Sequence, residues 1–339
     1  MPSSTITDPA APFAVSLGDP AGVGPEIVAK SWVMRDMRGL PPFFAVGDPA
    51  SLRAVWGGPI RVIDSPEQAV GAFVAALPCL QVTHAGPITP GQPTAEGARA
   101  AFEALEAAVG LARSGSAAGI VTAPVAKEQL YGVGFVHPGQ TEFVAERCGV
   151  AAHNAVMMLA GPSLRVVPIT IHVALADVPR TLTIDLIRAR ALTTAKGLQR
   201  NFGIARPRLA VAALNPHAGE GGAIGREEIE LIRPAVESLA AEGLDIRGPL
   251  SADGMFHARA RETYDAALCM YHDQALIPIK TLHFDDGVNM TLGLPIIRTS
   301  PDHGTAFGIA GSNSANPGAM IAAIRMAAEA ARCRKLHGG

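Results

Sequence analysis

Short apolar runs alternate with helical patterns along the whole chain. The runs that predict buried strands are 13–17, 43–47, 119–122, 157–160, 164–171, 208–214 and 266–271. The periodic stretches that predict helices begin at Pro25 and span 94–114, 183–199, 226–241 and 317–334. Because strands alternate with helices, we expect an α/β protein with one or two largely parallel sheets.

Local signals refine several of these helices. Thr94 and Thr183 stand where a helix N-cap is expected, and Pro25 suits a first helical position because its missing N–H costs nothing there. Pro234 lies inside the 226–241 pattern, so we expect a kink in that helix.

Polar and glycine residues cluster directly after the predicted strands. The segments are GDPAGVG after Leu17, TAP after Val121, NPHAGE after Leu214 and HDQ after Tyr271. Since ligands of open parallel sheets bind outside the carboxyl ends of the strands, we expect these loops to form the walls of one site.

Composition limits the class of protein. A chain of 339 residues exceeds the size at which one core stops growing, so two domains are expected. A net charge of −2 without a basic stretch argues against nucleic-acid binding. No apolar run is long enough to span a membrane, and the N-terminus lacks the apolar core of a signal peptide. The four cysteines form no CxxC pair and suggest thiols in a reducing compartment, which predicts a cytoplasmic protein.

Three of the ten histidines fall at strand ends in polar company, namely His172, His217 and His272. Imidazole is the commonest transition-metal ligand, and a catalytic site needs about three protein ligands. Their spacing is long and irregular. Three unrelated histidines that bond to the backbone therefore remain an alternative to a metal site.

A second group consists of Lys280, Asn289 and Arg298, which recur every nine residues. Cations with a neutral donor suit a phosphate or a carboxylate, and arginine adds bidentate geometry. The alternative is a pair of solvated charges on a surface ribbon.

The segment 300–320 combines glycine turns, hydroxyls, a histidine and an asparagine before it opens a helix. Backbone N–H groups in such a loop can line the phosphates of an adenosine cofactor. A GxGxxG loop after the first strand is absent, because Pro20 and Pro25 interrupt the glycines at 18, 22 and 24. Two carboxylates, Asp253 and Asp273, are candidates for acid–base work or for orienting a histidine, and a simple turn cap is the alternative for each.

Taken together, the segments GDPAGVGPEI, VTAPVAKE, LNPHAGEGG, MYHDQALIPIK and GVNMTLGLPIIRTSPDHGTA resemble the 4-hydroxythreonine-4-phosphate dehydrogenase family of vitamin B6 biosynthesis. The resemblance covers nearly the whole chain, in the family's order. It implies two α/β/α lobes around a central cleft, as in isocitrate and isopropylmalate dehydrogenases and not as in Rossmann proteins. The implied division is 1–128 plus 285–339 for the cofactor-side lobe and 129–284 for the lobe of metal binding and dimerisation.

The resemblance also implies roles for individual residues. It implies metal binding by His172, His217 and His272 in a site shared across a homodimer, and substrate binding by Lys280, Asn289 and Arg298. The family's Gly-His-Thr-Glu motif reads Gly-Gln-Thr-Glu at 139–142, so Thr141 matches and Gln140 replaces a histidine. Glutamine forms hydrogen bonds but carries no proton at neutral pH, which affects the choice of substrate more than the fold.

The implied reaction is oxidation of 4-phosphooxy-L-threonine at C3 by NAD+ or NADP+, followed by loss of CO2 to give 3-amino-2-oxopropyl phosphate. Three imidazoles suit Zn2+ or Co2+ better than Mg2+. The resemblance to isocitrate and isopropylmalate dehydrogenases places the cofactor on His303, Gly304, Thr305, Ala306 and Asn316.

Several alternatives stay open. A relative could oxidise another 4-phosphorylated acid, such as D-threonate or D-erythronate 4-phosphate, and Gln140 keeps that possibility alive. A relative that oxidises a cyclic dihydrodiol dicarboxylate would not need the phosphate residues. A metal-dependent hydrolase or lyase without cofactor and a non-catalytic binding protein are alternatives of other classes.

Overall fold

The computed structural model describes residues 11–336, which form two compact units. Unit 1 runs over 11–148 and 295–331, and unit 2 over 149–294 and 332–336. The absence of a signal peptide is predicted mainly from residues 1–10. These residues lie outside the described part of the chain. The assignment of a cofactor side and a metal side to the chain stays a prediction.

Unit 1 contains a parallel sheet with the strand order β3-β4-β2-β1-β5-β12. Its strands are β1 (Phe13–Ser16), β2 (Phe43–Gly47), β3 (Ile60–Ile63), β4 (Leu77–Gln81), β5 (Ile120–Thr122) and β12 (Arg298–Pro301). β1 and β2 are buried throughout, as expected for parallel strands covered on both faces. After β1 the chain adds β2, β3 and β4 along one edge of β1, and β5 then pairs with the opposite edge of β1. Loops after β1 and β5 therefore flank a topological switch point.

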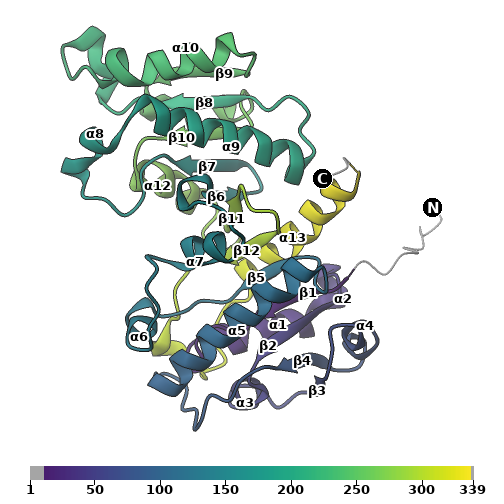
Figure 1. Cartoon of the computed structure of the whole chain (residues 1–339). Coiled ribbons are helices and arrows are strands. Elements are labelled where there is room, and N and C mark those ends of the chain that lie inside the picture. Colours follow the sequence, from purple (N-terminus) through teal and green to yellow (C-terminus); the bar gives the residue numbers. More distant parts are fainter. Residues whose placement is uncertain (1–10, 337–339) are drawn as a thin grey trace. The chain divides into compact units, whose positions relative to one another are not determined.

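Helices connect and cover these strands. They are α1 (Gly24–Val33), α2 (Arg35–Arg38), α3 (Pro49–Arg53), α4 (Gln68–Phe73), α5 (Ala95–Ser114), α6 (Lys127–Tyr131), α7 (Gln140–Arg147), the short turn η6 (Phe307–Ile309) and α13 (Gly318–Leu336). The long helix α5 packs across β1 and β2 (Figure 1). α13 lies against β12, where the Thr299 hydroxyl donates to the carbonyl of Ala323 at 2.9 Å.

Unit 2 contains a mixed sheet with the strand order β11-β6-β7-β10-β8-β9. Its strands are β6 (Val156–Gly161), β7 (Leu164–Pro168), β8 (Leu209–Ala212), β9 (Ile246–Leu250), β10 (Ala266–Cys269) and β11 (Val288–Leu292). β6 runs antiparallel to β7 and β11, and the pairs β7–β10, β10–β8 and β8–β9 are parallel. The carboxyl ends of β7, β10 and β8 consequently lie at one edge of the sheet.

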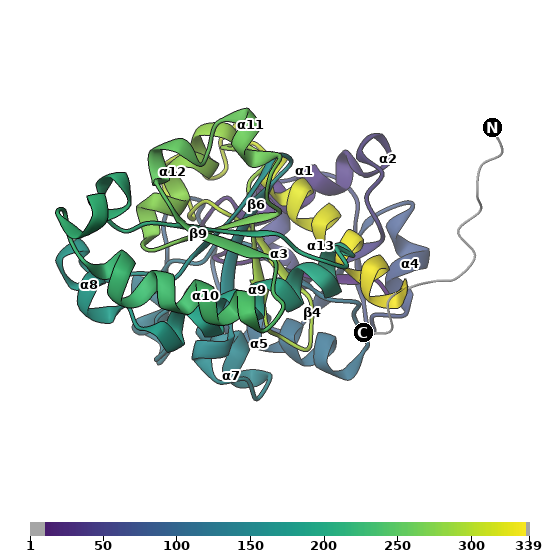
Figure 2. The same cartoon turned by 90° about the horizontal axis from the view of Figure 1, so that it is seen from above.

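The helical elements of unit 2 are the turns η1 (Ala152–Asn154), η2 (Leu175–Asp177), η3 (Pro216–Gly222) and η5 (Ala252–Gly254), the π-helical turn η4 (Glu228–Ile232), and α8 (Val178–Thr181), α9 (Ile184–Phe202), α10 (Arg233–Ala241), α11 (Ala258–Arg261) and α12 (His272–Leu282). α9 and α10 pack side by side (Figure 2).

The expected helix starts are confirmed. The Thr94 hydroxyl accepts the N–H of Gly97 at 3.0 Å, and the Thr183 hydroxyl accepts that of Leu186 at 3.1 Å. The kink expected at Pro234 stays a prediction, and the structure shows a π-helical turn that ends at Ile232, two residues before this proline. Proline has no N–H to complete a regular α-helical turn, so a wider turn is accommodated there.

Other parts of the chain fold differently from the prediction. The strand expected at 266–271 ends at Cys269, and the HDQ segment, for which a loop is expected, opens helix α12. The strand expected at 164–171 ends at Pro168. Lys280, Asn289 and Arg298 lie in α12, β11 and β12, and Arg298 is buried. The alternative that they are solvated charges on a surface ribbon is therefore wrong.

The α/β fold class is confirmed, and the strand order of unit 1 differs from that of Rossmann proteins. The four cysteines are free, and burial raises the pKa of Cys79 to about 12. No helix among residues 11–336 is long and apolar enough to cross a membrane.

Gly18 gives a test of the switch-point loop. Its φ of 68° is unfavourable for other residues, and a Cβ would lie 2.3 Å from the carbonyl oxygen of Pro124. We expect Gly18→Ala to lower the free energy of unfolding by more than about 2 kcal/mol in equilibrium urea unfolding.

Gly110 is the matched control, because it lies inside α5 and a Cβ added there would meet nothing within 4 Å. We expect Gly110→Ala to stabilise the protein by about 0.5–1 kcal/mol. Equal effects of the two substitutions would contradict the role assigned to Gly18.

Candidate active site

The loops that follow β1 and β5 are bonded to each other. The Asp19 N–H donates to the carbonyl of Pro124 at 3.0 Å, and Asp19 Oδ1 accepts the N–H of Ala21 at 3.0 Å. Asp19 is 2% exposed, and its burial raises the pKa of its carboxyl group. These contacts fix the two loops that flank the switch point.

Arg298 lies beside the carboxyl end of β5. Its Nη2 donates to the Thr122 hydroxyl at 3.0 Å and to Gln140 Oε1 at 3.4 Å, and its Nη1 donates to the Thr141 hydroxyl at 3.4 Å. Burial of the guanidinium lowers its pKa to about 10, so the side chain stays charged at neutral pH. The charge of Glu142 acts on the guanidinium in the opposite direction and raises its pKa. A buried guanidinium is suited to an anionic group. The structure thus brings together three of the predicted substrate residues, Gln140, Thr141 and Arg298.

In unit 2, two of the predicted metal histidines lie together. His172 follows β7 and His272 follows β10, and because these strands are parallel, both side chains lie at the same edge of the sheet. The ring centroids are 5.8 Å apart, and the ring planes are inclined by 39°. His272 Nδ1 lies 2.9 Å from Asp273 Oδ1, which leaves Nε2 as the nitrogen for another ligand.

Buried polar contacts fix the backbone around this pair. The Thr170 hydroxyl donates to the carbonyl of Met270 at 2.7 Å, joining the loop before His172 to the loop before His272. Gln274 accepts the Met270 N–H at 2.7 Å and donates to the carbonyl of Ala213 at 2.8 Å. The end of β8, which leads to His217, is therefore tied to the same edge.

His217 lies in η3 with a left-handed backbone, at φ 50° and ψ 32°. Its Nδ1 is 3.2 Å from Glu220 Oε2, and its side chain is 69% exposed. The neighbouring turn η5 carries Asp253, whose pKa is lowered first by the Ser251 hydroxyl at 2.6 Å and more weakly by the charge of His217. An exposed carboxylate with a lowered pKa is a weaker base than an ordinary aspartate.

A divalent ion would find a partial set of ligands in unit 2. The tilted His172–His272 pair, with one ring nitrogen of His272 bonded to Asp273, suits two neutral imidazole ligands of one ion. Within residues 11–336, however, no three His, Cys, Asp or Glu side chains converge as a metal site. The structure of one chain therefore does not bring His217 together with the other two histidines.

The remaining predicted substrate residues also lie in unit 2. Lys280 lies on α12, about two turns beyond His272, and Asn289 lies on β11. Asn289 Oδ1 is buried and has no hydrogen-bond partner in the described structure. A buried acceptor of this kind is costly unless a ligand or water satisfies it.

The predicted cofactor segment of unit 1 is anchored to the start of α1. The Val23 N–H donates to the carbonyl of Thr305 at 2.9 Å, and Ala306 has a left-handed backbone with φ 44°. His303 is exposed and lies beside Gly304, with Nδ1 3.0 Å from its carbonyl oxygen. Asn316 Oδ1 accepts the N–H of Gly318 at 2.9 Å and so stabilises the start of α13.

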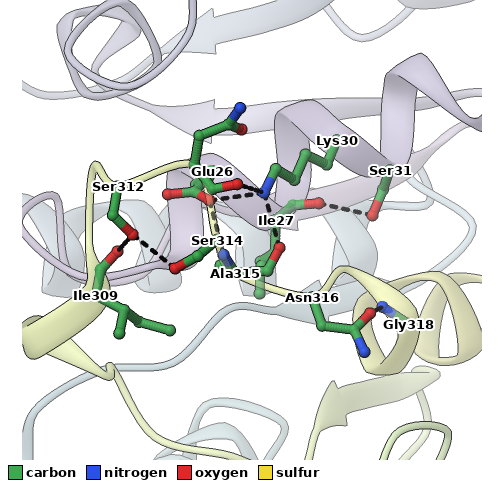
Figure 3. Close-up of polar contacts among 11 residues, drawn as sticks. Glu26, Ile27, Lys30, Ser31, Ile309, Ser312, Ser314, Ala315, Asn316 and Gly318 are labelled. Carbon is green, nitrogen blue, oxygen red and sulfur yellow. Dashed lines mark hydrogen bonds and ion pairs between the residues drawn. The ribbon is translucent and has the colours of Figure 1, made fainter.

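An ion pair on α1 between the buried Glu26 and the partly buried Lys30 holds the end of this segment (Figure 3). Lys30 Nζ donates at 2.8 Å to Glu26 Oε1, to the carbonyl of Asn313 and to the carbonyl of Ala315. Glu26 Oε1 also accepts the Ala315 N–H at 3.0 Å. Lys30 thus donates one hydrogen bond with each of its three ammonium protons. We infer that its role is to fix the backbone at 313–315.

Sequence reasoning missed several of these groups. Thr122 belongs to the TAP segment expected in a site wall, but its contact with Arg298 could not be predicted, because the two residues lie far apart in the chain. Glu26 and Lys30 have the i,i+4 spacing of a helical ion pair, but their contacts with the backbone of Asn313 and Ala315 left no local pattern. Glu220 could have been found, because it follows His217 by three residues in HAGE, as a candidate for orienting that imidazole.

Residues 41–327 match the family model described as pyridoxal phosphate biosynthetic protein PdxA. The chain belongs to this family. It is 58% identical over 326 residues to a 4-hydroxythreonine-4-phosphate dehydrogenase from Zymomonas mobilis, covering 96% of this chain and 97% of that protein. A Caulobacter vibrioides protein of the same description is 52% identical, with coverage of 95% and 98%.

Solved structures agree with this assignment. A 4-hydroxythreonine-4-phosphate dehydrogenase from Klebsiella pneumoniae superposes with a TM-score of 0.84 at 37% identity, covering 95% of this chain and 99% of that one. A terephthalate 1,2-cis-dihydrodiol dehydrogenase from Burkholderia xenovorans gives 0.65 at 29% identity, with coverage of 94% and 98%. The predicted membership of a dehydrogenase family of the PdxA type is confirmed.

The Glu26–Lys30 pair gives a prediction about the cofactor segment. Lys30→Met leaves the Glu26 carboxylate, whose side chain is 2% exposed, with the Ala315 N–H but without its counter-ion. We expect a loss of about 2–3 kcal/mol in the free energy of unfolding, measured in urea. Adding Glu26→Gln should recover part of this loss, since the buried charge is then removed.

Arg180→Met is the control, because the Arg180–Asp177 pair is 83% and 55% exposed. An exposed pair of this kind contributes little, so a change below about 0.5 kcal/mol is expected. If Lys30→Met were no more destabilising than Arg180→Met, the anchoring role of the pair would be wrong.

Proposed function

We propose that the chain oxidises 4-phosphooxy-L-threonine with NAD+ or NADP+ in a reaction that depends on a divalent metal ion. The product, 2-amino-3-oxo-4-phosphooxybutanoate, is a β-keto acid that loses CO2 to give 3-amino-2-oxopropyl phosphate, a precursor of pyridoxine 5′-phosphate. The observation that carries this proposal is the 58% identity, over 96% of the chain, to a protein described as 4-hydroxythreonine-4-phosphate dehydrogenase.

The anionic groups of the substrate are assigned to two sets of side chains. Arg298, with Gln140 and Thr141 beside it, offers a charged guanidinium and neutral hydrogen-bonding groups. Lys280 and Asn289, whose Oδ1 is buried, are proposed as further substrate-binding residues. Side chains that bind the anionic groups of a small substrate also orient it for reaction.

His172, His217 and His272 are proposed to hold one divalent ion, Zn2+, Co2+ or Mg2+, with nitrogen ligands favouring the first two. The chemistry that a bound ion supplies is polarisation of the substrate hydroxyl. Because one chain brings only His172 and His272 together, we propose that a homodimer completes the set across its interface.

The two predicted carboxylates receive different roles. Asp273, bonded to His272 Nδ1, orients that imidazole and favours the tautomer with Nε2 free. Asp253, near His217, is proposed as the base that accepts the hydroxyl proton, although its lowered pKa makes it a weaker base. The nicotinamide cofactor is assigned to the segment with His303, Gly304, Thr305, Ala306 and Asn316.

A second candidate within the family is oxidation of D-threonate or D-erythronate 4-phosphate. The observation that favours it is Gln140, whose carboxamide bonds to Arg298 Nη2 and to the carbonyl of Ala123 at 3.4 Å each. This neutral group gains no proton near neutral pH, so it offers a substrate a different contact from a histidine.

The substrate is tested by a panel read through absorbance of NADH or NADPH. We expect turnover with 4-phosphooxy-L-threonine, its loss after EDTA treatment, and its return with Zn2+ or Co2+, since removal of the ion removes the polarising group. Faster turnover of D-threonate 4-phosphate would favour the second candidate. Turnover of none of these acids with either cofactor would exclude both candidates.

Gln140→Glu tests the anion site. The substitution preserves shape but places a carboxylate 3.4 Å from Arg298 Nη2, where it competes with the anionic substrate. We expect KM for the phosphorylated substrate to rise about tenfold or more, corresponding to about 1.4 kcal/mol, with a smaller change in kcat. Gln199→Glu, on the exposed side of α9, is the control, and equal KM values for the two variants would contradict the assignment.

A further inference from the structure

The turn that carries His217 has an unusual backbone. Five successive residues, His217 to Gly221, have left-handed dihedrals, with φ values of 50°, 54°, 78°, 45° and 66°. Three of them are not glycine, and each such residue costs about 1–2 kcal/mol in this conformation. A turn of this kind persists only where the surrounding structure holds it.

One buried carboxylate holds both the start and the middle of this turn. Glu228 is 1% exposed, and its Oε1 accepts the N–H groups of Leu214 at 2.9 Å and Asn215 at 2.7 Å. Its Oε2 accepts Asn215 Nδ2 at 3.0 Å and lies so close to Gly219 that a Cβ there would be 2.6 Å away. The backbone before His217 and the glycine after it are therefore both placed against the same side chain.

The helix that carries Glu228 is itself irregular at this point. Glu228 opens the π-helical turn that precedes Pro234, and π-helical turns often occur near functional sites. Its neighbour Glu227 accepts the same Asn215 amide at 2.7 Å. Glu227 and Glu228 thus both bind the segment before His217, from 12 to 14 positions further along the chain.

We propose that Glu228 is a positioning residue for His217, and that it presents this imidazole to a divalent ion by bonding the N–H groups of Leu214 and Asn215. The inference rests on the metal site of the proposed function and adds a residue to it. Glu228 does not itself contact the ion or the substrate. Its effect reaches the site through the conformation of residues 214–221.

Three variants separate this role from general stabilisation. Glu228→Leu removes every acceptor, whereas Glu228→Gln keeps one acceptor oxygen for the two backbone N–H groups. Glu230→Gln is the matched control, because Glu230 lies on the same turn, is 57% exposed and pairs with Arg226. If Glu228→Leu does not fold, Glu228→Gln carries the test.

The first measurement is hydrogen exchange of the full chain, followed by mass spectrometry of peptides that cover 213–223. We expect faster exchange of this segment in Glu228→Leu, an intermediate effect in Glu228→Gln, and wild-type exchange in Glu230→Gln. The second measurement is Co2+ binding, followed by its visible absorbance. We expect Kd for Co2+ to rise about 10–100-fold in Glu228→Leu and less in Glu228→Gln, as for other residues that orient a metal ligand.

Turnover gives a third measurement. Activity of Glu228→Leu should fall at subsaturating Co2+ and recover at saturating Co2+, which loss of folded protein would not produce. Unchanged exchange of 213–223 together with unchanged Co2+ affinity would overturn the inference. If the wild-type protein bound no Co2+, the metal site of the proposed function would fail, and the exchange measurement alone would decide whether Glu228 holds the turn.

Discussion

The parallel pairing of strands is the constraint on which every candidate site depends. Ser16 pairs with Thr122 at the ends of β1 and β5, and Pro168 pairs with Cys269 at the ends of β7 and β10. Residues that follow paired parallel strands must emerge at the same edge of a sheet. Arg298 lies beside Thr122 because β12 also pairs with β5, with Arg298 opposite Ile120. The His172–His272 pair owes its position to the pairing of β7 with β10.

Sheet pairing brings loops together, and buried carboxylates then determine their shape. Glu26 and Glu228 lie on helices of different units. Glu26 accepts the N–H of Ala315, 289 positions away, and Glu228 accepts the N–H groups of Leu214 and Asn215 from the loop before its own helix. A carboxylate has lone pairs for several donors, so it can satisfy N–H groups that an irregular loop leaves without helix or strand partners. Glu26 also has the ammonium group of Lys30 as a counter-ion, which offsets the cost of a buried charge.

Strand pairing and buried carboxylates together explain what the sequence could and could not predict. Apolar runs and threonine caps identified most strands of the two sheets and the starts of α5 and α9, because those signals are local. The strand ends marked His172, His217 and His272 for the same reason. Contacts such as Arg298 with Thr122, or Glu26 with Ala315, join residues more than 170 positions apart and leave no local pattern. The helix that begins at His272 was missed because its polar first turn resembles a loop.

The proposed metal site involves histidines whose geometry differs within one chain. His172 and His272 adopt a paired arrangement with a hydrogen-bonded carboxylate behind one ring, whereas His217 is 69% exposed on a left-handed turn. Strain of this kind is retained where a particular orientation of a side chain is required, so the turn itself argues that His217 has a role outside its own loop. A catalytic zinc site usually has three protein ligands. In the proposed function, the homodimer would supply this third ligand, because an exposed, strained imidazole would then bind the ion across the interface.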